Sequence, residues 1–337
     1  MTNENTFSRR GFIHAAAAAA AATTITSGGG MLRRVAFAHG DRDRLLPRNR
    51  LGIQLFTLRD QVANVGFEAV FRELARQGYA EVEFAGYTQG AALPPITVRE
   101  IRRLLDRYGL RGVGSHIGLD QFRDNLTQVL DDAQTLGLPY VGTANAPDAL
   151  FPPAERNTPE AYSRAAELFN GFGAAAKARG IKFYQHNHAG EFAIVNGTRL
   201  WDVVIAETDP ALVSFEIDIY WAYVGQFLFG GFDPIAYVKA QPRRFPLYHV
   251  KDGVRSSSAN GYNFVDVGDG VHDFRRFFET VGVPGHHYIV ERDDAPSNPA
   301  GSFSTAARSV AYLRNLRPCQ GESHDRDHDR DWDDRGD

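Results

Sequence analysis

The chain is poor in the residues that form cross-links, nucleic-acid-binding faces and membrane spans. Its 337 residues include a single cysteine, Cys319, which excludes an internal disulfide and a zinc site built from cysteines. The net charge of −4 leaves no basic surplus for a nucleic-acid partner. The weakly apolar run Ala15–Ala22 is too short to span a bilayer permanently. What remains, with 43% hydrophobic and 23% charged residues, is the composition of an ordinary soluble globular protein.

The N-terminal segment has the pattern of an export signal. Ser8–Ile13 contains the twin arginines Arg9 and Arg10, the apolar run follows, and Ala36–Ala38 is an A-x-A cleavage site. We therefore predict a twin-arginine (Tat) signal peptide over residues 1–38, a partner in the Tat export machinery, and a periplasmic or secreted mature protein without membrane contact. An alanine-rich disordered tail is the alternative interpretation.

Two further stretches flank the predicted domain. Residues 39–49 are interpreted as a linker. Residues 317–337 are interpreted as a disordered acidic tail, because from Gln320 onward one glutamate and seven aspartates face three arginines and little can be buried. The domain itself is predicted to cover residues 50–316.

Between these flanks, short apolar runs alternate with amphipathic stretches that carry helix caps. Thr97 and Glu100, for example, form a capping-box pattern, and Gly109 stops the same helix. The predicted strands are 51–56, 81–84, 111–116, 140–143, 181–186, 212–217, 246–250 and 287–291. The predicted helices are 67–77, 97–108, 120–136, 158–179, 198–207, 232–240, 273–281 and 302–313. This succession predicts an α/β fold, a single-domain (β/α)8 TIM barrel.

The segments between these elements are predicted as loops. We expect an aromatic loop over residues 218–231 and a loop rich in serine, asparagine and glycine after the seventh strand. A doubly wound sheet is the competing architecture. It needs a glycine-rich phosphate-binding turn after its first strand, and Leu55–Leu58 contains no glycine.

Four of the predicted strands end in side chains that bind metals or move protons. Strand alternation places His186, Asp218, His249 and Glu291 at inward-facing positions, and the carboxyl ends of barrel strands meet at one mouth. Two imidazoles and two carboxylates suit Mn²⁺, Zn²⁺, Co²⁺ or Fe²⁺. Each residue alone is more often structural, but the four together predict a divalent metal centre with positions open to a substrate.

The motifs around these residues match a known family in their order. The matching segments are His186–Phe192, Asp218–Trp221, His249–Asp252, Val267–Gly270 and Val290–Asp293. With them the chain resembles the xylose isomerase-like TIM barrels, the superfamily of sugar phosphate isomerases and epimerases, over residues 50–316. The resemblance implies a metal site of the Glu, Asp, His, Glu type, in which His186 replaces the glutamate of strand five. It also implies a pair of proton-moving glutamates, of which only Glu291 is present.

The absent glutamate leaves open which groups move the proton. Glu291 is the first catalytic candidate, and His188 or Glu191 supplies the second from the same strand end. His188 could instead bind a substrate hydroxyl or support a ligand, and Glu191 could form a structural salt bridge. The residues predicted to bind substrate are His116, Lys251, Trp221 and Glu83. A buried structural role is the alternative for His116 and Glu83.

The combined pattern predicts a metal-dependent isomerase or epimerase that removes a proton next to the carbonyl of an unphosphorylated sugar or keto-sugar. A phosphorylated sugar is disfavoured because Gly253 and Gly285 are isolated, so no phosphate cradle follows strands seven and eight. A lyase acting on 3-keto-glycosides shares the first step and stays open. So does a non-catalytic periplasmic sugar-binding protein, which would need no metal. A nuclease on the same barrel is disfavoured by the acidic charge, and a homo-oligomer is left open.

Overall fold

The computed structural model describes residues 44–90 and 95–319. The predicted signal peptide over residues 1–38 and the acidic stretch from residue 320 onward lie outside the described residues, so both remain predictions. Within the described ranges, no helix is long and apolar enough to cross a membrane.

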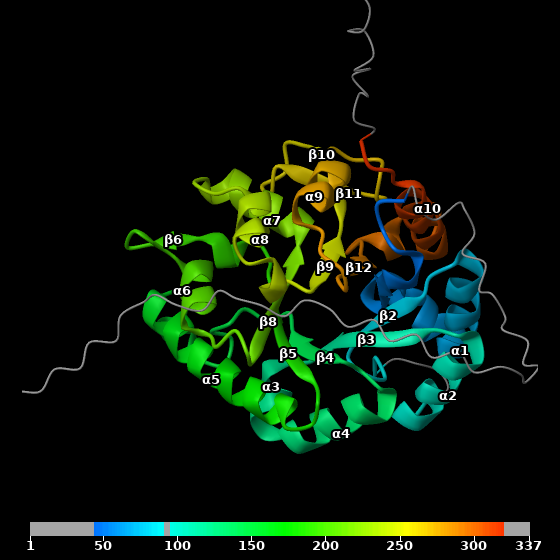
Figure 1. The fold of residues 1–337 in the computed structure, drawn as a ribbon, viewed down its shortest axis with the longest axis horizontal. Helices are drawn as coiled ribbons and strands as arrows, with labels where there is room; N and C mark the ends of the chain where they lie inside the picture. Colours follow the sequence, from blue (N-terminus) through cyan, green and yellow to red (C-terminus); the bar gives the residue numbers. More distant parts are fainter. Residues whose placement is uncertain (1–43, 91–94, 320–337) are drawn as a thin grey trace, which may run out of the picture. The chain divides into compact units, whose positions relative to one another are not determined.

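Eight parallel strands form a closed barrel, which confirms the predicted TIM barrel (Figure 1). The strands are β1 (Leu51–Gln54), β2 (Glu81–Ala85), β3 (Arg111–His116), β4 (Tyr140–Thr143), β5 (Lys182–His186), β8 (Val213–Asp218), β9 (Leu247–Val250) and β12 (His287–Val290). Each strand lies beside the next one along the chain, and the barrel closes where β12 pairs with β1. The strand ends agree with the predicted ones to within about two residues, because apolar runs bounded by turns are a strong strand signal.

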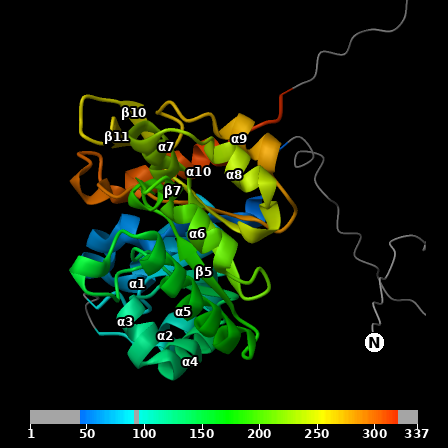
Figure 2. The ribbon, with the colours of Figure 1, turned by 90° about the vertical axis from the view of Figure 1, so that its left-hand side faces the viewer.

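Helices cover the outside of the barrel in both views (Figures 1 and 2). They are α1 (Arg59–Gln77), α2 (Val98–Tyr108), α3 (Leu119–Asp124), α4 (Leu126–Leu136), α5 (Pro159–Lys177), α6 (Leu200–Glu207), α7 (Ile219–Phe229), α8 (Pro234–Ala240), α9 (Phe274–Val281) and α10 (Ser302–Asn315). Two small antiparallel hairpins accompany them, β6 (Ile194–Val195) with β7 (Thr198–Arg199) and β10 (Asp252–Arg255) with β11 (Tyr262–Val265).

Helix caps set most helix boundaries as predicted. The Thr97 side chain accepts the backbone N–H of Glu100, the Glu100 side chain accepts that of Thr97, and Gly109 ends α2 at φ 66°. The predicted helix over residues 67–77 is only the second part of α1. Its first turns precede Gly66, whose φ of 75° and ψ of 168° kink the helix.

The predicted aromatic loop over residues 218–231 is wrong, because most of it forms α7. Asp218 ends β8 and caps the helix by accepting the backbone N–H of Trp221 at 2.9 Å. No proline or glycine that would break the helix early stands before Gly225, and Gly230 ends it. The run is apolar on all sides, which hid the helical period from the sequence pattern.

The predicted loop after the seventh strand is also wrong, since it contains the hairpin β10–β11. The hairpin lies beside α7 in Figure 2, and Tyr220 of α7 stacks on Phe264 of β11 at 4.4 Å. The carboxylate of Asp252 accepts the backbone N–H groups of Gly268 and Gly270 at 2.9 and 3.0 Å, which ties the following loop to the hairpin. This packing fixes the segment next to Lys251.

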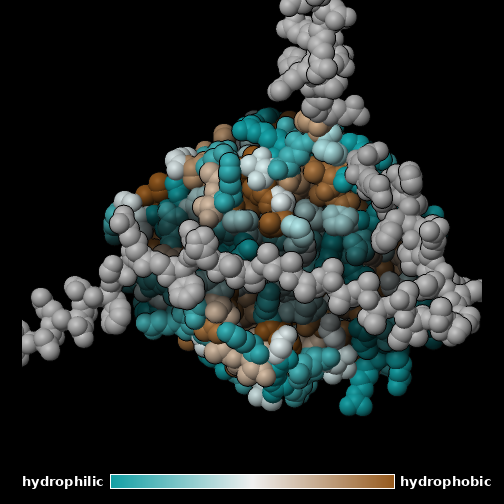
Figure 3. Space-filling view, viewed as in Figure 1, coloured by the Kyte–Doolittle hydropathy of each residue, from teal (hydrophilic) through white to brown (hydrophobic). Residues whose placement is uncertain are grey.

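Apolar side chains fill the barrel below its mouth. A buried layer inside the barrel consists of Val113, Tyr140, Tyr184, Leu247 and Ile289. A second, larger core fills the space between strands and helices and includes Phe84, Phe183 and Phe215. The face drawn in Figure 3 is mainly hydrophilic, with smaller hydrophobic areas between the hydrophilic ones. Because the apolar layer occupies the inward positions deeper in the barrel, the polar inward positions lie near the carboxyl ends of the strands.

Candidate active site

A cavity of about 270 Å³ opens at the carboxyl ends of the barrel strands. Its lining residues are Phe56, Ala85, His116, Ala144, His186, His188, Lys251, Glu291 and Asp293. Most of the polar members were predicted as site residues. The cavity lies where barrel enzymes place their chemistry, because loops after the strands can vary without disturbing the core.

The four predicted metal ligands lie together beside this cavity. His186 Nε2 is 3.7 Å from Asp218 Oδ2, and His249 Nδ1 is 3.9 Å from the same oxygen. His249 Nδ1 is 2.7 Å from Glu291 Oε2. All four side chains are buried. Nitrogen and oxygen atoms from four neighbouring strands thus face one another, and their role as metal ligands stays a prediction.

The described residues offer two overlapping sets of ligand atoms that lie within 4.8 Å of one another. The two sets are Asp218, His249 and Glu291, and His116, His186, Glu216 and His249. The predicted quartet therefore draws its members from both sets, with His249 common to them.

Glu216 was not predicted as a site residue. Its Oε2 lies 2.8 Å from His116 Nε2, 2.9 Å from His186 Nδ1 and 3.1 Å from His249 Nε2. Burial raises the pKa of Glu216, but His249 and the hydrogen bonds from the other two imidazoles outweigh it and hold the pKa well below its usual range. Its inward parity with Asp218 was the available signal.

Lys251 supplies a buried positive charge at the cavity wall. Its Nζ lies 2.9 Å from Asp218 Oδ2, 2.8 Å from Glu291 Oε2 and 2.7 Å from Asp293 Oδ1. Burial lowers the pKa of Lys251, but the three carboxylates outweigh it and raise the pKa well above its usual value. Sequence reasoning missed Asp293, although it stands in the motif Val290–Asp293.

The two other catalytic candidates, His188 and Glu191, have different surroundings. His188 lines the cavity, and burial, assisted by Lys251, lowers its pKa to about 4, so the imidazole is neutral at pH 7. In the described part of the chain, no side chain hydrogen-bonds to its ring. Glu191 accepts the backbone N–H of His188 at 2.9 Å, and burial raises its pKa to about 7. Glu191 is not among the cavity-lining residues.

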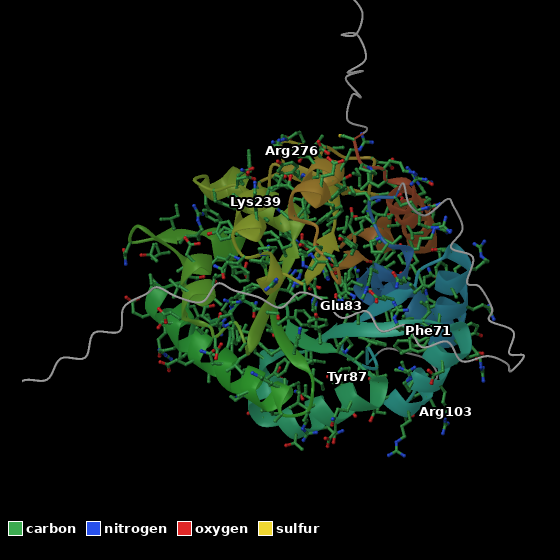
Figure 4. All side chains as sticks on the ribbon, in the orientation of Figure 1. Phe71, Glu83, Tyr87, Arg103, Lys239 and Arg276 are labelled. Carbon is green, nitrogen blue, oxygen red and sulfur yellow. The ribbon has the colours of Figure 1, made fainter. Side chains whose placement is uncertain are left out.

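The four residues predicted to bind substrate divide into two pairs. His116 and Lys251 line the cavity. Trp221 donates its Nε1–H to Asp293 Oδ2 at 3.2 Å. Glu83, labelled inside the barrel in Figure 4, is fully buried, accepts from Gln54 Nε2 at 2.9 Å and lies 2.6 Å from His249 Nε2. The contacts of Glu83 and Trp221 are thus with protein groups that line or support the cavity.

The donor set fits a divalent cation. Two buried carboxylate oxygens, Glu216 Oε1 and Asp218 Oδ2, have no hydrogen-bond donor among the described residues, although Lys251 Nζ approaches the second as an ion pair. Buried acceptors without donors are uncommon in folded proteins and often mark an ion position. Imidazole and carboxylate ligands together suit first-row transition metals.

Comparison with known proteins agrees with the fold. Residues 65–316 match the model of the family described as "Xylose isomerase-like TIM barrel". The inosose dehydratase of Geobacillus thermodenitrificans is 28% identical over 173 residues, which cover 47% of this chain and 55% of that protein. The inosose dehydratase of Clostridium beijerinckii is 26% identical over 177 residues, 46% of this chain and 54% of that protein. The chain spans about half the length of these curated relatives.

Solved structures show the same architecture over most of the chain. A sugar phosphate isomerase/epimerase from Parabacteroides distasonis has a TM-score of 0.64 at 24% identity and covers 80% of this chain and 94% of its own. A probable 3-DHS dehydratase involved in petrobactin synthesis in Bacillus anthracis has a TM-score of 0.58 at 13% identity and covers 79% of this chain and 99% of its own. At such identities the likeness shows the fold alone.

Proposed function

Because the chain belongs to the xylose isomerase-like TIM barrel family, we propose that it is a metal-dependent enzyme that removes a proton next to the carbonyl of a small carbohydrate. One observation carries the proposal. A metal-competent cluster, the neutral imidazole of His188 and the ammonium of Lys251 all border the same cavity. A base that takes the proton and positive charges that stabilise the developing oxyanion both favour proton removal next to a carbonyl.

Four ligand atoms would hold the metal. They are His186 Nε2, Asp218 Oδ2, His249 Nδ1 and Glu291 Oε2. When bound, Mn²⁺, Zn²⁺, Co²⁺ or Fe²⁺ supplies a positive charge that polarises the carbonyl and stabilises an enediolate. This donor set admits all four ions.

The chain's own groups then bind the substrate and move the proton. His188 is the base of the proposal, because its ring borders the cavity, is neutral at pH 7 and has no side-chain partner in the described residues. Lys251 donates to the substrate oxygen that becomes negative, since its ammonium is held in place by Asp218 and Asp293. Glu191 holds the His188 backbone, so we now propose a supporting role for it.

Elimination is the favoured outcome. His188 takes the proton from the carbon next to the carbonyl, the electron pair forms a C=C bond, and the same imidazole returns the proton to the leaving oxygen on the next carbon. Water or an alcohol is released, and the bonds and protons balance. Two observations support elimination over epimerisation: curated relatives are named dehydratases, and His186 stands where the family's second glutamate is expected.

Isomerisation or epimerisation of a keto-sugar is the second candidate, since it shares the first step and requires only that the proton return to carbon. That the substrate is unphosphorylated stays a prediction in either case, because Gly253 follows β9 but Gly285 precedes β12 and lies away from the carboxyl end of that strand. We also propose that the twin-arginine segment directs the folded protein to the periplasm or outside, which cell fractionation of the full chain and of Arg9→Lys/Arg10→Lys would test.

Solvent exchange tests the proposal. The full chain with Mn²⁺ is incubated in D₂O with an unphosphorylated keto-inositol and, separately, a 3-keto-glucoside, and NMR follows deuterium at the carbon next to the carbonyl. We expect exchange or elimination that stops with a chelator. His188→Gln is the matched control, because it keeps the proposed ligands. If the chain binds metal and sugar but no proton exchanges in either compound, the result contradicts the proposed enzymatic activity and supports the sugar-binding alternative.

A further inference from the structure

The carboxylate of Glu216 contacts three imidazoles from three other strands. The same oxygen, Oε2, is within 3.1 Å of ring nitrogens of His116 on β3, His186 on β5 and His249 on β9. Glu216 itself lies on β8, fully buried, two residues before Asp218. Among the described residues, no other carboxylate oxygen contacts three imidazoles.

The direction of the hydrogen bonds determines which nitrogen of each imidazole carries a hydrogen. An ionised carboxylate accepts hydrogen bonds and donates none, so each facing ring nitrogen must carry a hydrogen. His186 then has its hydrogen on Nδ1 and a lone pair on Nε2. His249 carries a hydrogen on Nε2, which also lies 2.6 Å from Glu83 Oε2. The opposite nitrogen of each ring is the one that remains for a metal.

The remaining nitrogens point at the predicted ligand oxygens. His186 Nε2 lies 3.7 Å from Asp218 Oδ2, and His249 Nδ1 lies 2.7 Å from Glu291 Oε2. A nitrogen lone pair facing a carboxylate oxygen is repulsive unless a cation or a proton lies beside them. His186 Nε2 and Asp218 Oδ2 form such a pair. His249 Nδ1 is instead hydrogen-bonded to Glu291 Oε2, so a metal bound there would replace the hydrogen on Nδ1.

We propose that Glu216 is a positioning residue, which holds His186 and His249 in the tautomers and ring orientations that present Nε2 and Nδ1 to a metal shared with Asp218 and Glu291. This inference rests on the proposed function, because it assumes that a metal binds at this position. In this arrangement Glu216 acts through the histidines, because its Oε2 contacts three imidazoles. Its Oε1, which has no hydrogen-bond donor among the described residues, is the competing ligand atom that the titration below distinguishes. Partners that orient metal-bound histidines in this way commonly change metal affinity by about 10–100-fold.

Co²⁺ titration of the metal-free full chain, followed by visible absorption, tests the proposal. We expect Glu216→Gln to weaken Co²⁺ binding by about 10–100-fold and to alter the absorption bands, because the neutral amide donates to one ring and disturbs its tautomer. Glu291→Gln should abolish the bands. His116→Ala is the matched control, since it removes a Glu216 partner but no proposed ligand, and should change affinity by less than about threefold.

Two results overturn the proposal. Glu216→Gln with the affinity and bands of the wild type would give Glu216 no positioning role. Loss of Co²⁺ in both Glu216→Gln and His116→Ala, with binding retained in Glu291→Gln, would place the metal in the other set, with Glu216 as a ligand. Circular dichroism of each variant separates these results from unfolding.

A second measurement needs no variant and no metal. Long-range ¹H–¹⁵N NMR of the histidine rings in the metal-free wild type should show the hydrogen of His186 on Nδ1. A hydrogen on Nε2 overturns the tautomer assignment. A wild type that binds no Co²⁺ contradicts the proposed function, and the NMR result then decides the role of Glu216 separately: a hydrogen on Nδ1 supports it.

Discussion

Two glutamates on the same strand, Glu81 and Glu83, show how the two ends of the barrel differ. Glu81 lies 2.7 Å from His287 Nδ1 and 2.8 Å from Arg111, with Arg50 at 3.7 Å. Glu83 lies 2.6 Å from His249 Nε2, but burial and the nearby carboxylate of Glu216 raise its pKa. Both are buried partners of a histidine, and strand alternation points both inward. A buried glutamate beside a histidine therefore does not by itself identify an active site.

Charge balance separates the two ends. Around Glu81 two arginines offset one carboxylate, and no unpartnered acceptor occurs there among the described residues. At the mouth, three of five carboxylates contact Lys251 and the other two contact imidazoles, Glu216 Oε1 has no donor among the described residues, and a cavity opens. The mouth carboxylates are Glu83, Glu216, Asp218, Glu291 and Asp293. We therefore assign stability to the first end and chemistry to the second, the usual division in this architecture.

The largest effect is expected from a ligand at the mouth. Glu291→Gln should lower the rate of proton exchange by about 10⁴-fold, because it removes a proposed metal ligand and a partner of Lys251 together. The NMR exchange assay with keto-sugars measures this. Retained exchange above about a tenth of the wild-type rate would contradict the assignment of this end to chemistry.

A smaller loss of proton-exchange rate is expected when the proposed base is replaced. His188→Gln should lower exchange by about 10²–10³-fold, since it removes the base and leaves the ligands in place. Metal analysis of the same sample should give the wild-type content. If metal is lost as well, His188 belongs to the ligand set and the base must be sought elsewhere.

At the end of the barrel opposite the mouth, a substitution should change stability alone. Glu81→Gln should lower the free energy of unfolding by about 1–3 kcal/mol, because it weakens buried hydrogen bonds to His287 and Arg111. Exchange activity and metal content should not change. Denaturant unfolding measures the stability, and the exchange assay measures the activity. An activity loss as large as that of Glu291→Gln would contradict the assignment of stability to one end and chemistry to the other.

The smallest effect is a pH dependence at Glu81. Burial raises the pKa of this carboxyl, but His287 and Arg111 outweigh it, so the pKa lies below its usual value of 4.5. A lowered carboxyl pKa stabilises the folded state above the unfolded pKa, and this contribution is lost as the pH falls through the folded pKa. The stability difference between wild type and Glu81→Gln should therefore shrink on going from pH 7 to about pH 3.5. A constant difference would contradict the ionised pair.

The sequence predicted the barrel because its strands are short apolar runs separated by capped helices, and period-two alternation placed the proposed ligands on inward-facing positions. It did not predict α7, whose residues are apolar all round, or the hairpin β10–β11, whose first strand holds one apolar residue, Val254. The role of Glu216 could not be read from its neighbours in the chain. It depends on His116, which lies 100 residues away and meets Glu216 only when the barrel closes.

The most direct test of the account is metal analysis of the purified full chain beside Glu291→Ala and Glu81→Gln. We predict about one equivalent of a divalent transition metal in the wild type and in Glu81→Gln, and its loss in Glu291→Ala. A well-folded wild type that contains no metal and takes up none when Mn²⁺, Zn²⁺, Co²⁺ or Fe²⁺ is supplied would contradict the account and favour a sugar-binding protein.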